Sequence, residues 1–470
     1  RRMFSMKVFK KHASILLAII MLFGVFSINA FAEKTSEQPQ VSKMSSFDET
    51  IFSFNNPNGR LMCVANRGNW RSFPENSLEG IQSCIDMGVD IISIDVQRTK
   101  DGKFILLAED DLSRMCVLED GRTATAKVSE ETLNDMKEFY FLRNSRGGAN
   151  AKPTKYKVPS LEETINLCKG KAMIMIDNAW EYGDEIQSLV KSLEADEIVI
   201  LCGDVAPEDV SSYIDRNGLP ISHICGYYDG VMSSGAKKYI KDATSAGAKT
   251  IRLSSPNSYS SVFKKSVLKK FEGNGRAFVS TTSPELCGGR EDLRSDWSDL
   301  VLRGFSIIET NYPQDLVNYI KDVESYRSNL SALIAQAQGI NTSNYSKESS
   351  KVLKSALKDA QELTAIGSTS LETIDVARYN LQQAIDSMAP RGENESATVS
   401  TPIILLIIVI VILVSLGVFY ILRKNENRKS SNSSPDNENR SKKKPKKRKG
   451  NKNQNTNASK NDIPPQNPQS

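Results

Sequence analysis

The chain has 470 residues and a formal net charge of +5 at pH 7, but this charge is unevenly distributed along the sequence. Residues 423–470 carry a net charge of +10 and residues 1–32 carry +5, which leaves −10 for residues 33–422. An acidic body of this size argues against nucleic acid as its partner.

The N-terminal segment has the three parts of a secretory signal peptide. A basic region with three lysines precedes an apolar stretch at residues 15–28, and residues 30–32 read Ala-Phe-Ala, a small-x-small cleavage site. We therefore predict a cleaved signal peptide over residues 1–32, with an uncleaved anchor as the alternative. Residues 33–57 are interpreted as a spacer, because residues 33–46 are polar, contain proline and lack apolar periodicity.

The next stretch predicts one strand–helix–strand unit. Residues 61–65 form a short apolar run typical of a buried strand, which opens into a polar loop at residues 66–68. Asn76 is placed to cap a helix that ends near Met87, and residues 89–96 form a second apolar strand. This order predicts parallel pairing with a right-handed crossover.

The alternation of strands and helices continues as far as residue 309. Further strands are predicted at residues 104–107, 172–177, 197–202, 221–225, 250–253, 277–281 and 306–309. Helices are predicted at residues 129–139, 161–168, 185–193, 207–216, 236–246, 261–271 and 294–303. Eight or so parallel strands in about 260 residues predict an α/β fold, a single (β/α)₈ TIM barrel over residues 58–322, with its site at the strand C-termini.

A series of motifs lies on this scaffold. They read NRG at residues 66–68, PEN at 74–76, IDVQRTKDG at 94–102, FILLAEDDLSR at 104–114, VPSLEETI at 158–165 and FSIIETNYP at 305–313. In this order they resemble the glycerophosphodiester phosphodiesterases, whose pattern is HRG, PEN, ExDVxxTKDG and HDxxLxR, with a late strand followed by Thr-Asp-x-Pro. The resemblance implies a TIM barrel of the phospholipase C-like phosphodiesterase type.

Transferred residue by residue, the resemblance marks the chemical positions of the family on this chain. Its two catalytic histidines fall on Asn66 and Ala108. Two of its metal carboxylates fall on Ser93 and Asp95, and the third falls on Asp177. Two of three carboxylates therefore remain, whereas both histidines are substituted.

The loss of the imidazoles bears directly on turnover. In the family, one imidazole accepts a proton from the attacking hydroxyl and the other donates one to the leaving oxygen. Each transfer contributes roughly 10²- to 10⁴-fold, so losing both costs very roughly 10⁴- to 10⁸-fold, and less if they act as a unit. We predict a catalytically degenerate domain that binds a phosphodiester, a lipid headgroup or a cell-wall polymer. The alternatives are an active metal-dependent phosphoric diester hydrolase with altered acid/base groups, and a structural surface module.

The remaining polar groups define the expected site. Arg67 is the predicted phosphate contact, because its guanidinium offers a fork to two oxygens. Its alternative role is a salt bridge to Glu75 or Asp95 that holds the loop. Asp95 and Asp177 are candidates for a weak Mg²⁺ or Ca²⁺ site, with satisfaction by local donors as the alternative.

Two residues are candidates to replace the imidazoles. Asp110 has the side-chain parity to face the barrel axis. His223 is the only histidine beyond the predicted signal peptide, and we predict a packed or surface role for it rather than a catalytic one.

The seven cysteines form no C-x-x-C pair. Several lie in apolar runs, which predicts buried free thiols rather than a metal cluster or a disulfide framework.

Residues 326–389 contain three amphipathic helical patterns, with Gly339 and Gly367 in the breaks. They predict a small antiparallel bundle. Tyr345 before the second helix and the A-x-x-x-L motif at residues 377–381 resemble FIVAR modules of Gram-positive surface proteins. The resemblance implies a stalk, with glycan or protein binding as the alternative.

The C-terminal region has the pattern of a membrane anchor. A linker at residues 390–402 leads to residues 403–422, which carry no charge and are long enough to cross a hydrocarbon core of about 30 Å. The basic tail at residues 423–470 marks the cytoplasmic side. We predict a single-pass type I protein of the cell membrane with an extracellular ectodomain. The tail is expected to be disordered and to attract anionic lipid, with specific recognition by a cytoplasmic protein or RNA as the alternative.

Overall fold

The computed structural model describes residues 46–391, apart from residues 178, 211, 213–221 and 230–234. The predicted signal peptide, the membrane span and the basic tail lie outside the described residues. Among the helices of the described part, none combines the length and the apolar character that a membrane span needs.

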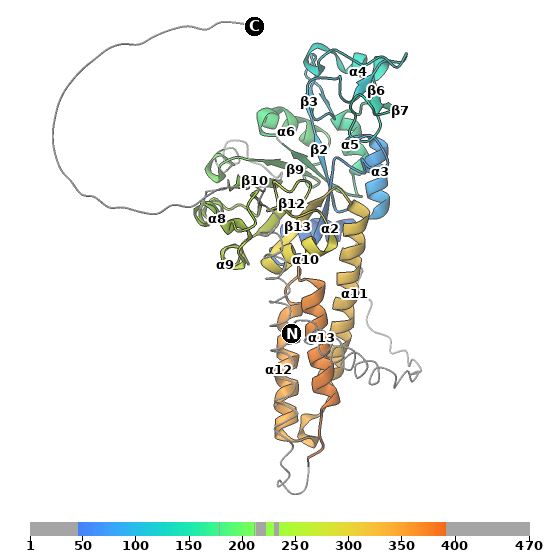
Figure 1. Ribbon diagram of the computed structural model, residues 1–470. Coiled ribbons are helices and arrows are strands. Elements are labelled where there is room, and N and C mark those ends of the chain that lie inside the picture. The colour runs from blue at the N-terminus through green and yellow to red at the C-terminus, as the bar shows by residue number, and fades with distance from the viewer. Residues whose placement is uncertain (1–45, 178, 211, 213–221, 230–234, 392–470) are drawn as a thin grey trace, which may run out of the picture. The chain divides into compact units, whose positions relative to one another are not determined.

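Eight parallel strands form a barrel with helices around it (Figure 1). Their order is β1-β13-β12-β11-β10-β9-β8-β2, and β2 pairs back to β1. The strands are β1 (Met62–Asn66), β2 (Ile91–Asp95), β8 (Met173–Asp177), β9 (Val199–Gly203), β10 (Ser222–Tyr228), β11 (Thr250–Ser254), β12 (Arg276–Ser280) and β13 (Phe305–Thr310). The helices around them include α3 (Leu78–Met87), α5 (Leu161–Cys168), α6 (Gly183–Ser192), α8 (Ala236–Ser245), α9 (Lys265–Leu268), α10 (Arg294–Arg303) and α11 (Pro313–Gln338). The predicted eight-stranded parallel barrel is confirmed.

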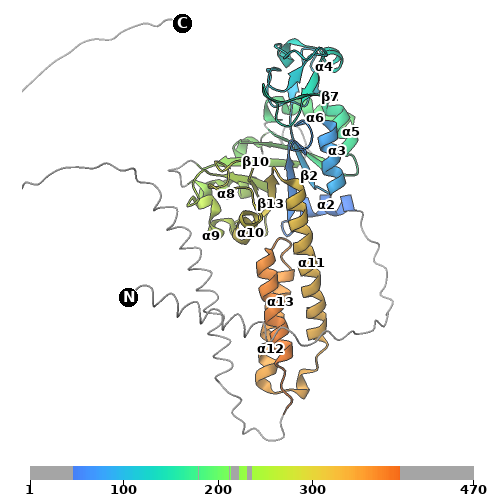
Figure 2. The ribbon, with the colours of Figure 1, turned by 45° about the vertical axis from the view of Figure 1, so that its right-hand side comes forward.

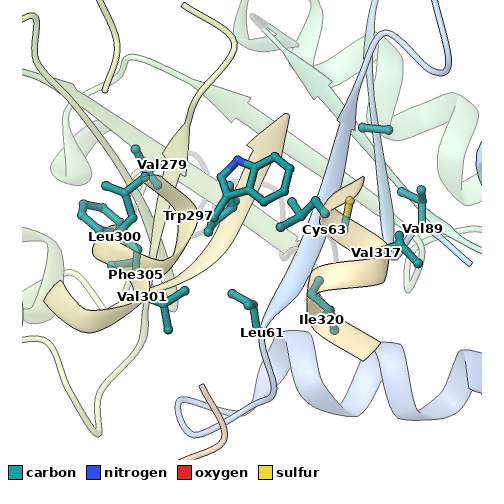
Figure 3. Packing of buried hydrophobic residues seen from close by; sticks show 14 of the residues in the cluster. Leu61, Cys63, Val89, Val279, Trp297, Leu300, Val301, Phe305, Val317 and Ile320 are labelled. Carbon is teal, nitrogen blue, oxygen red and sulfur yellow. The ribbon is translucent and has the colours of Figure 1, made fainter. Parts of the chain in front are cut away.

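Alternating side chains of the strands build two apolar layers. One fills the barrel interior, with Met62, Val64, Met175, Ile200 and Phe278 among its members. The other lies between the sheet and the surrounding helices. Figure 3 shows part of this outer layer, where side chains of α10 and α11 gather against β1.

A helix, α2 (Ser46–Asn55), stands where a spacer was predicted, so that prediction was wrong for these residues. Phe47, Ile51 and Phe54 recur at helical spacing. Phe54 is only 3% exposed and belongs to the interior cluster of the barrel, and Phe47 and Ile51 pack against the same cluster. Burial of this short apolar face against the barrel interior therefore stabilises helix α2.

The predicted third barrel strand, at residues 104–107, was also placed wrongly. It contributes β4 (Phe104–Ile105), which pairs antiparallel with β3 (Gln97–Arg98) outside the barrel. Only five residues separate these two strands, whereas a parallel pair needs a crossover of about a dozen. The next barrel strand is β8.

The segment between β3 and β8 lies outside the barrel sheet and has an apolar cluster of its own. It contains α4 (Leu133–Phe139) and a three-stranded antiparallel sheet of β5 (Cys116–Val117), β6 (Phe141–Arg143) and β7 (Pro153–Lys157). Both views place α4 and β7 at one end of the barrel, and α12 lies beyond the other (Figures 1 and 2).

Helix α11 runs without a break from the barrel into a bundle with α12 (Lys347–Thr364) and α13 (Leu371–Asp386) (Figure 2). The boundary predicted between residues 322 and 326 falls inside this 26-residue helix, so the barrel and the bundle share it.

The bundle also touches the segment that leads into β1. A Cβ atom at Gly367 would lie 1.8 Å from the carbonyl oxygen of Asn58, so only glycine permits this approach. The bundle therefore contacts the N-terminal end of the barrel.

The cysteines behave as predicted where they are described. Six of them are buried and free. Burial raises the pKa of the Cys84 and Cys168 thiols to about 12, so both remain protonated at neutral pH. The side chain of Cys225 lies outside the described part.

Replacing Phe54 tests the role of α2. We expect Phe54→Ala to lower the free energy of unfolding by about 3–5 kcal/mol, because it leaves a cavity under the barrel interior. Phe52→Ala is the matched control on the same helix, since Phe52 is 59% exposed, and it should change stability by no more than about 0.5 kcal/mol. Guanidinium chloride unfolding measures both. Equal losses of stability in the two variants would contradict the packing of Phe54 against the barrel interior.

Candidate active site at the barrel mouth

A polar cavity of about 350 Å³ opens at the carboxyl ends of the barrel strands. Its lining is formed by Asn66, Arg67, Ser93, Asp95, Arg146, Asp177, Asp204, Arg252, Ser254, Ser280, Thr282, Ser283, Leu286 and Glu309. Five of the six predicted site residues are in this set. Ala108 is the exception.

Strand register brings the predicted residues together. Asp95 at the end of β2 is level with Asp177 at the end of β8. On the other side of β2, Ser93 is level with Asn66 of β1. Parallel strands end at one edge, so residues far apart in sequence share the mouth.

The loop after β1 is held in a strained conformation. Arg67 has a φ of 56°, in the left-handed region that a side chain rarely adopts. Its amide donates to the carbonyl of Ser93 at 2.9 Å, and its own carbonyl accepts from the amide of Asn76 at 3.0 Å. These bonds fix the point at which the guanidinium leaves the backbone.

The guanidinium of Arg67 lies between two carboxylates. Its Nε is 2.8 Å from Oδ2 of Asp95, and its Nη1 is 3.2 Å from Oε2 of Glu75. Both salt bridges named as the alternative role of Arg67 are therefore present. Glu75 is 1% exposed and also pairs with Arg114 and Arg146. Burial alone would raise its pKa, but Arg67 and Arg114 hold that pKa below its ordinary value.

Asn76 is not the helix cap that the sequence predicts. Its φ is 58°, and its Nδ2 donates to Oδ2 of Asp95 at 2.9 Å. Ser77 caps α3 instead, accepting from the amide of Gly80 at 3.1 Å. The amide of Asn76 is engaged with Asp95, so the next polar residue takes the cap. Burial raises the pKa of Asp95, and Arg67 and Asn76 offset only part of that effect.

Asp177 faces a second arginine, which the sequence analysis missed. Arg252 of β11 places Nη1 at 2.8 Å from Oδ1 of Asp177 and Nη2 at 3.1 Å from Oδ1 of Asp204. A Cβ atom at Gly226 would lie 2.0 Å from that Asp204 oxygen, so glycine makes room for the pair. The available signal was an arginine at an inward position of an apolar strand.

Glu309 was missed as well. It lies on β13, level with Val64 of β1 and Ser280 of β12, and is 5% exposed. Burial, reinforced by the negative charge of Asp177, raises its pKa to about 6. A carboxylate inside the apolar run at residues 305–309 was the signal that could have found it.

Asn66, which the resemblance places at the first histidine position, has a hydrogen-bond partner in the structure. Its Nδ2 donates to Oδ1 of Asn311 at 2.9 Å, and Nε1 of Trp70 donates to the same oxygen at 3.1 Å. Asn311 in turn donates to the carbonyl of Thr282 at 2.9 Å. The Asn66 amide therefore belongs to a hydrogen-bonded network and cannot relay a proton.

The other candidates for proton transfer are not brought to the cavity. Ala108 lies beyond β4, where its carbonyl accepts from Gln97 at 3.3 Å. Asp110 does not line the cavity, contrary to the hypothesis of a substitute acid/base, because its carboxylate accepts from the amide and hydroxyl of Ser129 at 2.9 and 3.0 Å. His223 lies on β10, and its side chain is outside the described part.

The donor set does not fit a divalent metal. Mg²⁺ and Ca²⁺ require several oxygens converging on one point. Asp95 and Asp177 instead each face a guanidinium. Across the described residues, no group of three or more His, Cys, Asp or Glu side chains has the geometry to hold a metal ion.

Residues 67–204 match the model of the Glycerophosphoryl diester phosphodiesterase family. A glycerophosphodiester phosphodiesterase of Bacillus subtilis (strain 168) is 32% identical over 113 residues, which are 23% of this chain and 36% of the relative. The uncharacterized protein YqiK of the same organism is 30% identical over 111 residues, 24% of this chain and 42% of the relative. The chain thus spans less than half the length of these relatives.

The chain is also similar to solved structures. A glycerophosphoryl diester phosphodiesterase from Parabacteroides distasonis has 18% identity and a TM-score of 0.45, covering 59% of this chain and 93% of its own. A phosphodiesterase from Oleispira antarctica, in complex with the product sn-glycerol-3-phosphate, has 16% identity and a TM-score of 0.41, covering 58% and 99%.

The raised pKa of Glu309 predicts a pH dependence of stability. Between its ordinary pKa of 4.5 and its folded pKa of about 6, the folded chain holds more protons at this carboxyl than the unfolded chain. Its contribution to the free energy of unfolding therefore falls by about 2 kcal/mol as the pH rises through this window. Glu309→Gln should remove that fall, measured by urea unfolding at several pH values.

Glu285→Gln is the control for this experiment. It changes an exposed carboxyl on the loop after β12 and leaves Glu309 in place, so the pH dependence should persist. A wild-type profile that matches that of Glu309→Gln throughout the window would show that Glu309 ionises normally.

Proposed function

We propose that the barrel mouth binds a phosphodiester, a lipid headgroup or a cell-wall polymer and does not cleave it by proton relay between two imidazoles. The proposal is supported by the residues at the two positions that the resemblance assigns to histidine. Asn66 is hydrogen-bonded to Asn311, and Ala108 does not line the cavity. Among the described residues that form the lining, none is a histidine.

The lining offers suitable contacts for such a ligand. Arg67 and Arg146 stand at the mouth, and the Arg146 side chain is 47% exposed. Guanidinium groups with unused N–H donors can share a phosphate with the carboxylates that already hold them. The hydroxyls of Ser254, Ser280 and Thr282 suit the glycerol or sugar part of the ligand.

A second function, hydrolysis with altered acid/base groups, has one specific observation in its favour. Glu309 is buried in the cavity wall with a pKa raised to about 6 by burial and by Asp177. A carboxyl with such a pKa can both donate and accept a proton near neutral pH. Residual phosphoric diester hydrolysis would therefore depend on Glu309 and not on an imidazole.

Membrane attachment and the stalk role of the bundle are further parts of the proposal. The charge pattern at residues 403–470 supports a single-pass type I anchor with an extracellular barrel and a basic tail that attracts anionic lipid. The bundle, FIVAR-like in sequence, contacts the N-terminal end of the barrel at Gly367. It therefore leaves the mouth open to a ligand.

Replacing Arg67 tests the proposed contact. We expect sn-glycero-3-phosphocholine to release heat on titration into the purified chain, and Arg67→Ala to weaken this binding about 10- to 100-fold, the worth of a charge-assisted hydrogen bond. Arg67→Lys should weaken it less, because it keeps the charge but loses the fork. Arg98→Ala is the control, since Arg98 pairs with Glu185 and does not line the cavity.

The same samples separate the competing functions. Release of sn-glycerol 3-phosphate in the presence of Mg²⁺ or Ca²⁺, measured by a coupled enzymatic assay, would establish a hydrolase. Neither heat nor a thermal shift with any phosphodiester or metal would leave only a structural surface module.

A further inference from the structure

We infer that Arg252 is the fixed cation of this cavity, in the place that a divalent metal would otherwise take, so that ligand binding does not depend on Mg²⁺ or Ca²⁺. The inference rests on the proposed binding function and adds the nature of the cation to it.

The guanidinium of Arg252 has a defined position in the cavity wall. Arg252 extends from β11 between two carboxylates, at 2.8 Å from Asp177 and 3.1 Å from Asp204. It is only 9% exposed. Paired strands on both sides hold β11, with Gly226 level with Arg252 on one side and Phe278 on the other. The positive charge is therefore built into the barrel wall.

Asp95, the other candidate metal ligand, is also engaged by protein groups. Asp95 accepts from Nε of Arg67 at 2.8 Å and from Nδ2 of Asn76 at 2.9 Å. A divalent cation that bridged Asp95 and Asp177 would therefore have to displace two guanidinium groups. Bringing it beside them instead would place a divalent cation next to guanidinium groups of the same charge sign.

The charges that line the cavity nearly balance. Its lining contains four carboxyl groups, from Asp95, Asp177, Asp204 and Glu309, and three guanidinium groups, from Arg67, Arg146 and Arg252. Little negative charge remains for a divalent ion to neutralise.

The decisive variant removes the internal cation. Arg252→Ser takes the guanidinium from between Asp177 and Asp204 and opens their oxygens to an external ion. We expect the purified full-length wild-type chain to show no change of melting temperature with millimolar Ca²⁺. Arg252→Ser should melt lower without Ca²⁺ and gain several degrees when Ca²⁺ is added, a gain that EDTA reverses.

Two further variants make this gain specific. Arg290→Ser removes an arginine that is also 9% exposed but pairs with Asp299 away from the cavity, so it should lose stability without gaining a response to Ca²⁺. Adding Asp177→Asn to Arg252→Ser should abolish the gained response, because it removes one of the newly available ligands.

Calorimetry on the wild-type chain provides a test even if Arg252→Ser does not fold. Stoichiometric heat with Ca²⁺ or Mg²⁺ alone that disappears in Asp177→Asn would overturn the inference, whereas no heat supports it. Binding of sn-glycero-3-phosphocholine that is equal in EDTA and in Ca²⁺ also supports it, and binding lost in EDTA overturns it. No binding under either condition would defeat the proposed function, while the response of Arg252→Ser to Ca²⁺ would still decide the role of Arg252.

Discussion

Two ion pairs across the barrel mouth, Arg67 with Asp95 and Arg252 with Asp177, decide what this cavity can do. Charges in such a partly buried site are costly unless each has a partner, so removing one partner should destabilise the mouth. The pairs join β11 to β8 and the loop after β1 to β2, so they also hold together the edge that carries the site. The same groups therefore provide both the local rigidity and the electrostatic field of the mouth.

The two ends of the barrel have separate tasks. At the N-terminal end, Phe54 of α2 closes the interior, and the bundle approaches at Gly367. At the C-terminal end, the strands present the polar cavity, as they do in other barrels of parallel strands. Because α11 serves both the barrel and the bundle, the bundle extends the outer apolar layer of the barrel. Changes in the bundle should therefore act on stability before they act on the site.

Much of the fold and part of the site could be predicted from the sequence. Asp95 and Asp177 were selected because the family motifs mark their positions, and both line the cavity. Arg252 and Glu309 were missed because a charge within an apolar strand becomes meaningful only when the register of several distant strands is known. Helix α2 was missed for a related reason, since a ten-residue amphipathic segment needs the open end of the barrel to cover its apolar face.

Asn66 and Asn311 form an amide pair at the barrel mouth. The resemblance expects histidine at the first position and aspartate at the second, and this chain has asparagine at both, joined at 2.9 Å. An amide pair preserves a donor and an acceptor without any group that titrates near neutral pH. Catalysis requires interactions that strengthen in the transition state, whereas binding requires only that they exist in the ground state. Under the proposed binding function, the guanidinium groups and amides of the mouth would supply such ground-state contacts. Under the same proposal, histidine at position 66 alone would not make the mouth catalytic, because position 311 would still be asparagine and Asp95 and Asp177 would still be paired with arginines.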